Sequence, residues 1–226
     1  MGRRALIAGA TGLTGSRLLS LLLAEPAYER IHAVLRRPLP DAQQPAPGSP
    51  GAGRLVEHVV DFAALGRGAG LPEVDDVYLC LGTTIKVAGS QEAFRRVDFD
   101  AVVGLARLAR RHGASRCATV SALGADPSSR VFYSRVKGEA EAALAALDYS
   151  SLVVLRPSLI DGERQERRPG ERLSLALARP LAPLLPARLR PVAADANARC
   201  MLAAVLRGEP GLRVIESDRI VRGASG

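Results

Sequence analysis

A serine, a tyrosine and a lysine have the types and the spacing of an acid–base site. Tyr133 and Lys137 are four residues apart, so on a helix they share one face, and the lysine ammonium favours the ionised form of the phenol. Ser121 precedes Tyr133 by twelve residues and ends an apolar run. Hydride transfer to a carbonyl needs a proton for the developing alkoxide, which Tyr133 can supply while Ser121 orients the substrate oxygen. These three residues are the predicted catalytic set, although a Tyr-x-x-x-Lys pair alone is also typical of a buried ring beside a solvated lysine.

Three glycines near the start of the chain have the spacing of a phosphate-binding turn. Glycines 9, 12 and 15 follow a short apolar run and precede a leucine-rich segment, which predicts a strand, a tight turn and a helix. Glycine permits positive φ and a close approach of backbone N–H groups to a pyrophosphate, and the start of the helix adds its uncompensated N–H groups. Ordinary turns also use glycine, but the strand and helix on either side favour a nucleotide. The predicted contacts are Gly9, Thr11, Gly12, Leu13, Thr14 and Gly15.

Two arginines at the end of the next predicted strand indicate which dinucleotide is bound. In many dinucleotide sites an acidic side chain here accepts hydrogen bonds from the 2′-hydroxyl of the adenosine ribose. This chain has Arg36 and Arg37 instead. Two guanidinium groups can bind a 2′-phosphate through paired hydrogen bonds. We therefore expect NADP(H) to be preferred over NAD(H); the alternative is a pair of solvated surface arginines.

The ends of three further predicted strands complete the expected cofactor site. Asp61 and Phe62 close the third strand, where they can contact adenine. Pro157 ends the sixth strand. The backbone after the fourth strand must approach the cofactor closely, although its glycine also fits an ordinary turn. The residues concerned are Leu81, Gly82, Thr83 and Thr84.

The elements that must position these residues alternate between strand and helix. A helix capped by Ser90 is expected to end before Gly113, and two more are expected at residues 131–147 and 193–206. Such alternation builds a doubly wound parallel sheet, so the predicted fold class is α/β, of the Rossmann type, with the ligand at the C-terminal ends of the strands. The strands after the first are predicted at residues 30–36, 55–60, 74–81, 116–121, 151–156 and 212–216.

Two segments depart from this alternation within a single predicted domain. A chain of 226 residues with 47% hydrophobic content can build one core, so we expect one NAD(P)-binding domain over residues 1–226. Residues 38–53 contain five prolines and three glycines, which favours an irregular, mobile loop. From 161 to 191 the pattern breaks into arginines, prolines and short leucine runs. An insertion at about 158–191 is therefore expected to form a lid or wall on the substrate side.

The positive net charge raises the question of whether the chain binds nucleic acid or a small anionic ligand. The formal net charge is +8 and the isoelectric point is about 10.2, but arginine is spread through every segment and only 4% of residues are aromatic. No stacking platform for nucleic acid is apparent, and an anionic small ligand explains part of the bias. Four arginines of the insertion either attract an anionic substrate or partner, or are solvated and balanced by nearby glutamates. They are Arg164, Arg167, Arg168 and Arg172.

Cysteines, histidines and apolar runs exclude several other classes of protein. Cys80, Cys117 and Cys200 are few, odd in number and far apart, which argues against a disulfide framework and for a reducing compartment. The three histidines lack the spacing of metal ligands. No signal segment and no apolar run of about 20 residues is present. The sequence therefore predicts a cytoplasmic protein with no metal site and no membrane partner.

Several motifs in order along the chain resemble the atypical short-chain dehydrogenase/reductase family. They are Gly9-Ala10-Thr11-Gly12-Leu13-Thr14-Gly15, Ser121, Tyr133-x-x-x-Lys137 and Leu155-Arg156-Pro157. Within this family the chain is most similar to the Tat-interacting-protein-like oxidoreductases, over roughly residues 5–206. The motifs that carry this closer resemblance are Cys80-Leu81-Gly82-Thr83-Thr84, Ala88-Gly89, Arg96-Val97-Asp98, Val136-Lys137-Gly138-Glu139 and Arg164-Gln165-Glu166-x-Arg168-Pro169-Gly170-Glu171.

The resemblance implies a Rossmann fold that binds NADP(H) and transfers a hydride to or from a carbonyl or alcohol. It puts Ser121, Tyr133 and Lys137 in the catalytic positions, with Lys137 also reaching the nicotinamide ribose. Where many family members carry an asparagine that holds a relay water, this chain has Asp98. Some relatives bind the cofactor without turnover, so a non-catalytic NADP(H)-binding redox sensor, acting through protein partners, is the alternative. The substrate and the choice between monomer and homodimer are left open.

Overall fold

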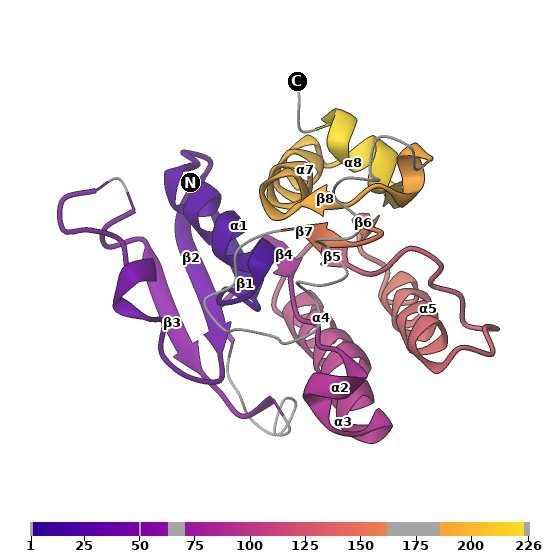
Figure 1. Cartoon of the computed structure of the whole chain (residues 1–226). Coiled ribbons are helices and arrows are strands. Elements are labelled where there is room, and N and C mark those ends of the chain that lie inside the picture. The colour runs from indigo at the N-terminus through magenta and orange to yellow at the C-terminus, as the bar shows by residue number, and fades with distance from the viewer. Residues whose placement is uncertain (1, 50, 63–70, 162–185, 224–226) are drawn as a thin grey trace.

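The computed structural model describes residues 2–49, 51–62, 71–161 and 186–223, and within them a seven-stranded sheet forms the centre (Figure 1). Its order is β3-β2-β1-β4-β5-β6-β9, and every pair of neighbouring strands is parallel. The predicted Rossmann-type α/β fold is confirmed. The strands are β1 (Arg3–Ala8), β2 (Tyr28–Leu35), β3 (Leu55–Val59), β4 (Asp76–Leu79), β5 (Arg116–Val120), β6 (Ser151–Arg156) and β9 (Gly211–Glu216).

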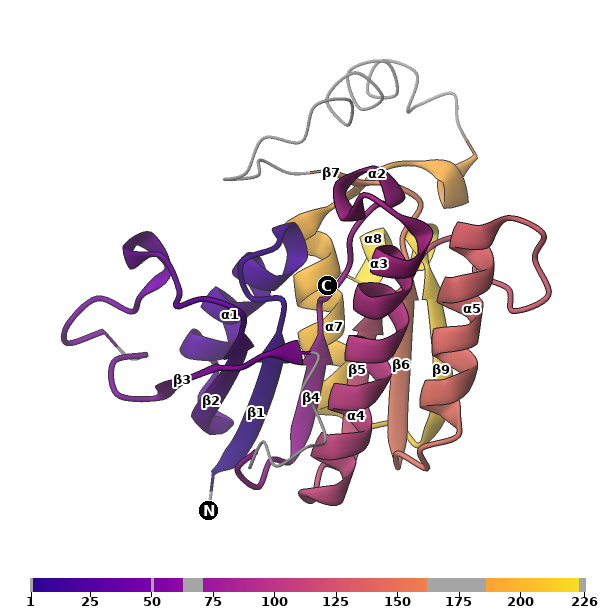
Figure 2. The same ribbon diagram turned by 90° about the horizontal axis from the view of Figure 1, so that it is seen from below.

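Helices cover both faces of the sheet. Figure 1 shows α1, α7 and α8 on one face and α4 and α5 on the other. In Figure 2 the C-terminal ends of the central strands face the side of the molecule on which α2 lies. The helices are α1 (Leu13–Ala24), α2 (Ile85–Ala88), α3 (Gln91–Arg95), α4 (Val102–Arg111), α5 (Phe132–Ala145), α7 (Ala194–Arg207) and α8 (Ser217–Gly223), with a π-helical segment, η3 (Arg96–Ala101), between α3 and α4.

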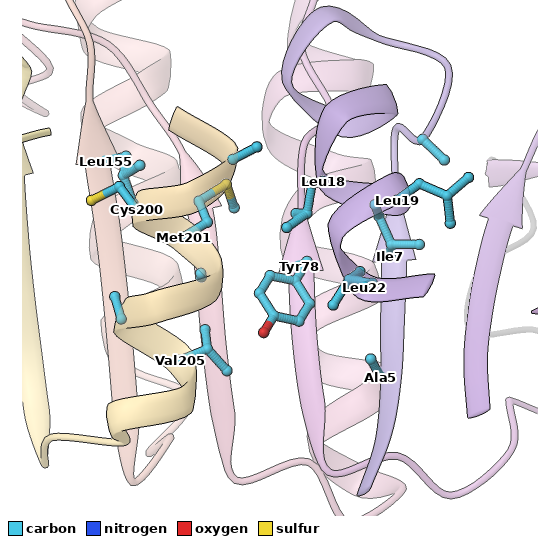
Figure 3. Close-up of a cluster of buried hydrophobic side chains, with 14 of the residues drawn as sticks. Ala5, Ile7, Leu18, Leu19, Leu22, Tyr78, Leu155, Cys200, Met201 and Val205 are labelled. Atoms are coloured by element: carbon cyan, nitrogen blue, oxygen red, sulfur yellow. The ribbon is translucent and has the colours of Figure 1, made fainter. Parts of the chain in front are cut away.

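The alternation of side chains along β1 divides the core between the two faces. Ala5 and Ile7 belong to the cluster under α1 and α7, whereas Leu6 and Ala8 belong to the cluster under α4, as expected for a parallel strand buried on both sides. Figure 3 shows the first cluster, in which leucines of α1 lie over β1 and beside Tyr78 of β4. Helices therefore cover both faces at the centre of the sheet, which leaves the strand ends as the place for a ligand.

Most predicted elements are found within a few residues of their expected positions. β6 has the predicted bounds, and the side chain of Ser90 caps the helix that follows it by accepting a hydrogen bond from Ala93 N. α7 ends at Arg207 and is capped by Gly208, whose φ is +61°. The predicted single helix from Ser90 is not regular, because its middle is η3. The expected loop at 38–53 contains a short 3₁₀ turn, Asp41–Gln43.

Some elements were not predicted. They are α2, α8 and a second, two-stranded sheet of β7 (Ile160–Asp161) and β8 (Val192–Ala193). This small sheet joins the start of the expected insertion to its end. Residues 162–185, with the four arginines of the insertion, lie outside the described residues.

Candidate active site

A large cleft lies at the C-terminal ends of the central strands. Its volume is about 2060 Å³, and it is lined by the β1–α1 turn, the ends of β2, β4 and β5, and residues of η3 and α5. Most of the residues predicted from the sequence to form the site therefore line one space. They are Gly9, Thr11, Gly12, Leu13, Thr14, Arg36, Arg37, Phe62, Leu81, Gly82, Thr83, Thr84, Ser121, Tyr133, Lys137 and Pro157.

Two of the predicted cofactor contacts, Gly15 and Asp61, are not part of this lining. A Cβ atom on Gly15 would lie 2.0 Å from the carbonyl oxygen of Gly9, so glycine is needed there for the helix to pack on the turn. Asp61 is exposed beyond the end of β3.

The turn between β1 and α1 has the features of an anion cradle. Gly12 caps α1 without a side-chain hydrogen bond, and no acidic residue occupies the first turn, so the helix dipole and its first N–H groups are available to an anion. The hydroxyl of Thr14 is buried without a hydrogen-bond partner among the described residues. Of the three glycines only Gly9 uses a positive φ, +83°; Gly12 has an ordinary φ of −78°.

The floor of the cleft is formed where β1 and β4 end side by side. A Cβ atom on Gly9 would lie 2.5 Å from the carbonyl oxygen of Cys80, so the two backbones can approach this closely only with glycine at position 9. Burial raises the pKa of the Cys80 thiol to about 12. Cys80 is therefore a neutral packing residue under the cleft rather than a nucleophile.

Three arginines line the end of the cleft beside β2. Arg36 and Arg37 follow β2, and Arg17 projects from α1; all are exposed. None has a hydrogen bond or an ion pair within the described part of the chain. Their donors are available to an anion in the cleft.

Lys137 is held by a buried ion pair. Its Nζ lies 2.8 Å from Asp98 Oδ1, and the other carboxylate oxygen of Asp98 accepts a hydrogen bond of 2.9 Å from Thr83 N. Burial disfavours the ammonium, but the charges of Asp98 and Tyr133 outweigh it and raise the pKa of Lys137. A Cβ atom on Gly82 would lie 3.6 Å from Asp98 Oδ1, so the end of β4 runs directly past the ion pair. Lys137 is therefore a fixed cation.

Tyr133 lies one helical turn before Lys137 on α5 and is partly exposed in the cleft. Its ring contacts Phe94 of α3, with 5.4 Å between centroids. Phe94 is fully buried and so fixes the position of the phenol. The tyrosine and lysine of the predicted catalytic set are thus brought together.

Ser121 has a partner that the sequence did not reveal. Its hydroxyl donates a hydrogen bond to the Glu141 carboxylate, which also accepts hydrogen bonds from the guanidinium of Arg156. Tyr133, Lys137 and Glu141 repeat at a spacing of four residues along α5, which is the one sequence feature that could have indicated Glu141. The serine, the tyrosine and the lysine all line the cleft, but the hydroxyl proton of Ser121 is directed away toward Glu141.

Curated proteins named FMP52 and HTATIP2 are among those similar to the chain. The protein named FMP52, mitochondrial, of Coccidioides immitis is 35% identical over 176 residues, which cover 72% of this chain and 68% of that protein. The protein HTATIP2 of Rattus norvegicus is 37% identical over 169 residues, which cover 74% and 67%. A search of protein-family models found no match.

Solved structures share the fold at low sequence identity. MoeE5 in complex with UDP-glucose and NAD superposes with a TM-score of 0.68 at 18% identity, covering 98% of this chain and 81% of that one. The Bordetella bronchiseptica enzyme WbmF in complex with NADH has a TM-score of 0.69 at 15% identity, covering 99% and 75%. Such identities show the Rossmann fold and nothing finer.

The names of the fungal relatives correct one prediction. Several FMP52 proteins are named mitochondrial, so the prediction of a cytoplasmic protein is contradicted. The prediction depended on scattered free cysteines and on the lack of a recognised secretory signal or long apolar run. These features indicate a reducing environment but do not distinguish one such compartment from another. No helix in the described ranges has the length and apolar character needed to cross a membrane.

Proposed function

Because the chain belongs to the atypical short-chain dehydrogenase/reductase family that includes FMP52 and HTATIP2, we propose that it binds NADP(H) and exchanges a hydride between this cofactor and a carbonyl or alcohol. One observation carries the proposal: the anion cradle of α1 and the fixed pair of Tyr133 and Lys137 line the same cleft. A nucleotide held at one end would bring its nicotinamide toward the other.

The residues present fit such a cofactor. The pyrophosphate is assigned to the first turn of α1, where the orphaned hydroxyl of Thr14 and the uncapped N–H groups face no competing carboxylate. The 2′-phosphate is assigned to Arg36 and Arg37, which have no partner in the described residues. Lys137 is assigned to the nicotinamide ribose. The preference for NADP(H) therefore depends on the two arginines, since the solved neighbours named above hold NAD or NADH.

The side chains supply the proton that accompanies the hydride. A bound nicotinamide gives up or accepts a hydride, which carries two electrons, at the substrate carbon. In reduction, Tyr133 donates its phenolic proton to the oxygen as the carbonyl π bond breaks, and in oxidation it takes that proton back. Lys137 stabilises the phenolate, and Asp98 holds Lys137 in place.

A non-catalytic NADP(H)-binding regulator is the second candidate function. The engagement of the Ser121 hydroxyl with Glu141 favours it, because this proton is not directed at a substrate carbonyl. The two functions predict different responses of the same protein.

A substrate panel separates the two functions. The protein is mixed with NADPH and a series of aldehydes, ketones and quinones, and cofactor oxidation is followed by absorbance. The oxidoreductase proposal expects oxidation that depends on both the protein and at least one carbonyl compound. Tight NADPH binding with no oxidation across the panel would instead support the regulator.

A further inference from the structure

We propose that Glu141 is a positioning residue that holds the hydroxyl proton of Ser121, so that Ser121 meets a ligand oxygen as a hydrogen-bond acceptor and selects a hydroxyl over a carbonyl. The inference rests on the proposed oxidoreductase function and states which hydrogen-bonding group Ser121 presents to the substrate. It makes an apolar alcohol, rather than a ketone, the ligand that this pocket binds better while Tyr133 is protonated.

The first step is that Ser121 has one proton and that this proton is taken. The side chain is 7% exposed and lines the cleft, and its hydroxyl donates to Glu141 Oε1. A hydroxyl that donates in one direction presents only lone pairs in the others. The part of Ser121 that faces the cleft is therefore an acceptor.

The second step is that Glu141 cannot reverse this hydrogen bond. Arg156 Nε lies 3.1 Å from Glu141 Oε1 and 3.2 Å from Oε2. A guanidinium has donors only, so both carboxylate oxygens of Glu141 act as acceptors toward Arg156. Glu141 is itself 9% exposed, so turning the Ser121 proton toward the cleft would leave a buried carboxylate short of a donor.

The third step concerns the charges around this pair. A small cavity of about 10 Å³ is lined by side chains of both ion pairs, and this is about the least volume that admits one water. The charged groups on it are Asp98, Lys137 and Glu141, and Arg156 contacts Glu141 from β6. The two ion pairs, Lys137 with Asp98 and Arg156 with Glu141, therefore lie next to each other beside Ser121.

The hydroxyl groups of Ser121 and Tyr133 together determine which ligand oxygen fits between them. While Tyr133 is protonated, an alcohol can donate its proton to Ser121 and accept from Tyr133; in oxidation that proton must turn from Ser121 to the Tyr133 phenolate. A carbonyl oxygen can accept from Tyr133 only, and at Ser121 it would face another lone pair. Part of the cleft wall near α2 and β7 is apolar, with Ile85, Val87, Leu159 and Ile160 among the lining residues, which favours an alcohol on an apolar body.

The substitution Glu141→Gln should turn Ser121 from a hydrogen-bond acceptor into a hydrogen-bond donor toward the ligand. Because Arg156 offers only donors, the amide oxygen of the glutamine must face Arg156, and its NH₂ group then faces Ser121. Ser121 becomes the acceptor of that hydrogen bond, and its own proton is free to point into the cleft. The variant therefore changes which ligand the serine suits without removing a side chain.

The test measures binding of a matched pair of ligands in complexes that cannot react. Cyclohexanol is titrated into the protein loaded with NADPH, and cyclohexanone into the protein loaded with NADP⁺, by calorimetry. We expect Glu141→Gln to weaken cyclohexanol and to tighten cyclohexanone, so that the ratio of the two dissociation constants changes by about tenfold, the size of one hydrogen bond. In a Ser121→Ala background the same substitution should leave the ratio unchanged.

Glu139→Gln is the matched control. Glu139 lies on the same helix and pairs with Arg95 and Arg135, but it does not contact Ser121, so the ratio should be that of the unmodified protein. If Glu141→Gln does not fold, Ser121→Ala alone decides: it should weaken cyclohexanol about tenfold and leave cyclohexanone unchanged.

Three results would overturn the inference: an unchanged ratio in Glu141→Gln, an equal change in the Ser121→Ala background, or no binding of either ligand to the loaded protein. A weaker affinity for cyclohexanone in Ser121→Ala would do the same, because it would show that the serine donates to a carbonyl. If the unmodified protein does not bind NADPH, the proposed function is contradicted instead. Titrating the cofactor before the ligands distinguishes that outcome from a failure of the inference about Ser121.

Discussion

Arg36 and Arg37 are the residues on which the choice of cofactor depends. Their guanidinium groups line the cleft and have no described partner, so a 2′-phosphate would gain charge-assisted hydrogen bonds that a 2′-hydroxyl cannot. We expect the protein to bind NADPH more tightly than NADH, and the double variant Arg36→Ala with Arg37→Ala to lose most of this difference. Titration by cofactor fluorescence measures both affinities. Equal affinities in the unmodified protein would contradict the assignment.

Asp98 is the residue that makes a buried lysine possible. The side chains of Lys137 and Asp98 are 8% and 0% exposed, so removal of the carboxylate leaves an uncompensated ammonium in the interior. We expect Asp98→Ala to lower the free energy of unfolding by about 3–5 kcal/mol, measured by urea denaturation. Asp98→Asn removes the same charge but keeps an acceptor for Thr83 N, so it should cost less, and the difference between the two losses measures the hydrogen bond. An Asp98→Ala variant as stable as the unmodified protein would contradict the role of the ion pair.

At the scale of elements, a pair of histidines joins β2 to the edge strand β3. His32 Nδ1 and His58 Nε2 are 2.9 Å apart. Burial, the neighbouring His58 and the arginines Arg4 and Arg30 lower the pKa of His32 to about 4, and burial lowers the pKa of His58. Both rings are therefore neutral in the folded protein at neutral pH.

Protonation of these rings should weaken the fold as the pH falls. The pKa of His32 is lower in the folded than in the unfolded chain, so its contribution is complete above about pH 6.5 and is lost progressively toward about pH 4. We expect the free energy of unfolding to drop over this range, and the drop to be smaller in His32→Gln. Urea titrations at a series of pH values test this, and identical pH profiles for the two proteins would contradict it.

Most of the helices and strands could be predicted from the sequence, but some could not. Periodicity and capping residues predicted the strands and the long helices, because their apolar patterns and Ser90 and Gly208 are local signals. The pairing of β7 with β8 could not be predicted, because two residues on each side carry no pattern and are brought together from distant parts of the chain. The π-helical turn that places Asp98 carries no recognised sequence pattern either.

The candidate site divides in the same way. The glycines of the cradle and the Tyr133–Lys137 pair were predicted because each motif lies within one turn or one helix. The bond from Ser121 to Glu141 and the ion pair from Asp98 to Lys137 join residues of different elements. Their formation depends on how the elements pack. Only the spacing of four residues along α5 pointed to Glu141, and Asp98 was identified without its partner.

At the scale of the whole molecule, the order of the strands places the cleft. The chain builds outward from β1 through β2 to β3, and then returns to the other side of β1 with β4, β5 and β6. The crossovers therefore diverge between β1 and β4, which opens a crevice at their C-terminal ends. The close approach of Gly9 to Cys80 marks this point, and the cradle and the proposed catalytic groups lie on its two sides.

The central claim is that this crevice carries out hydride exchange with Tyr133 as the proton donor, and the substitution Tyr133→Phe tests it most directly. The variant keeps the ring that packs on Phe94 and loses only the hydroxyl. With a carbonyl substrate from the panel, NADPH affinity should be unchanged while turnover falls by roughly 10²–10⁴-fold. Full reductase activity in Tyr133→Phe, with NADPH bound as in the unmodified protein, would contradict the account.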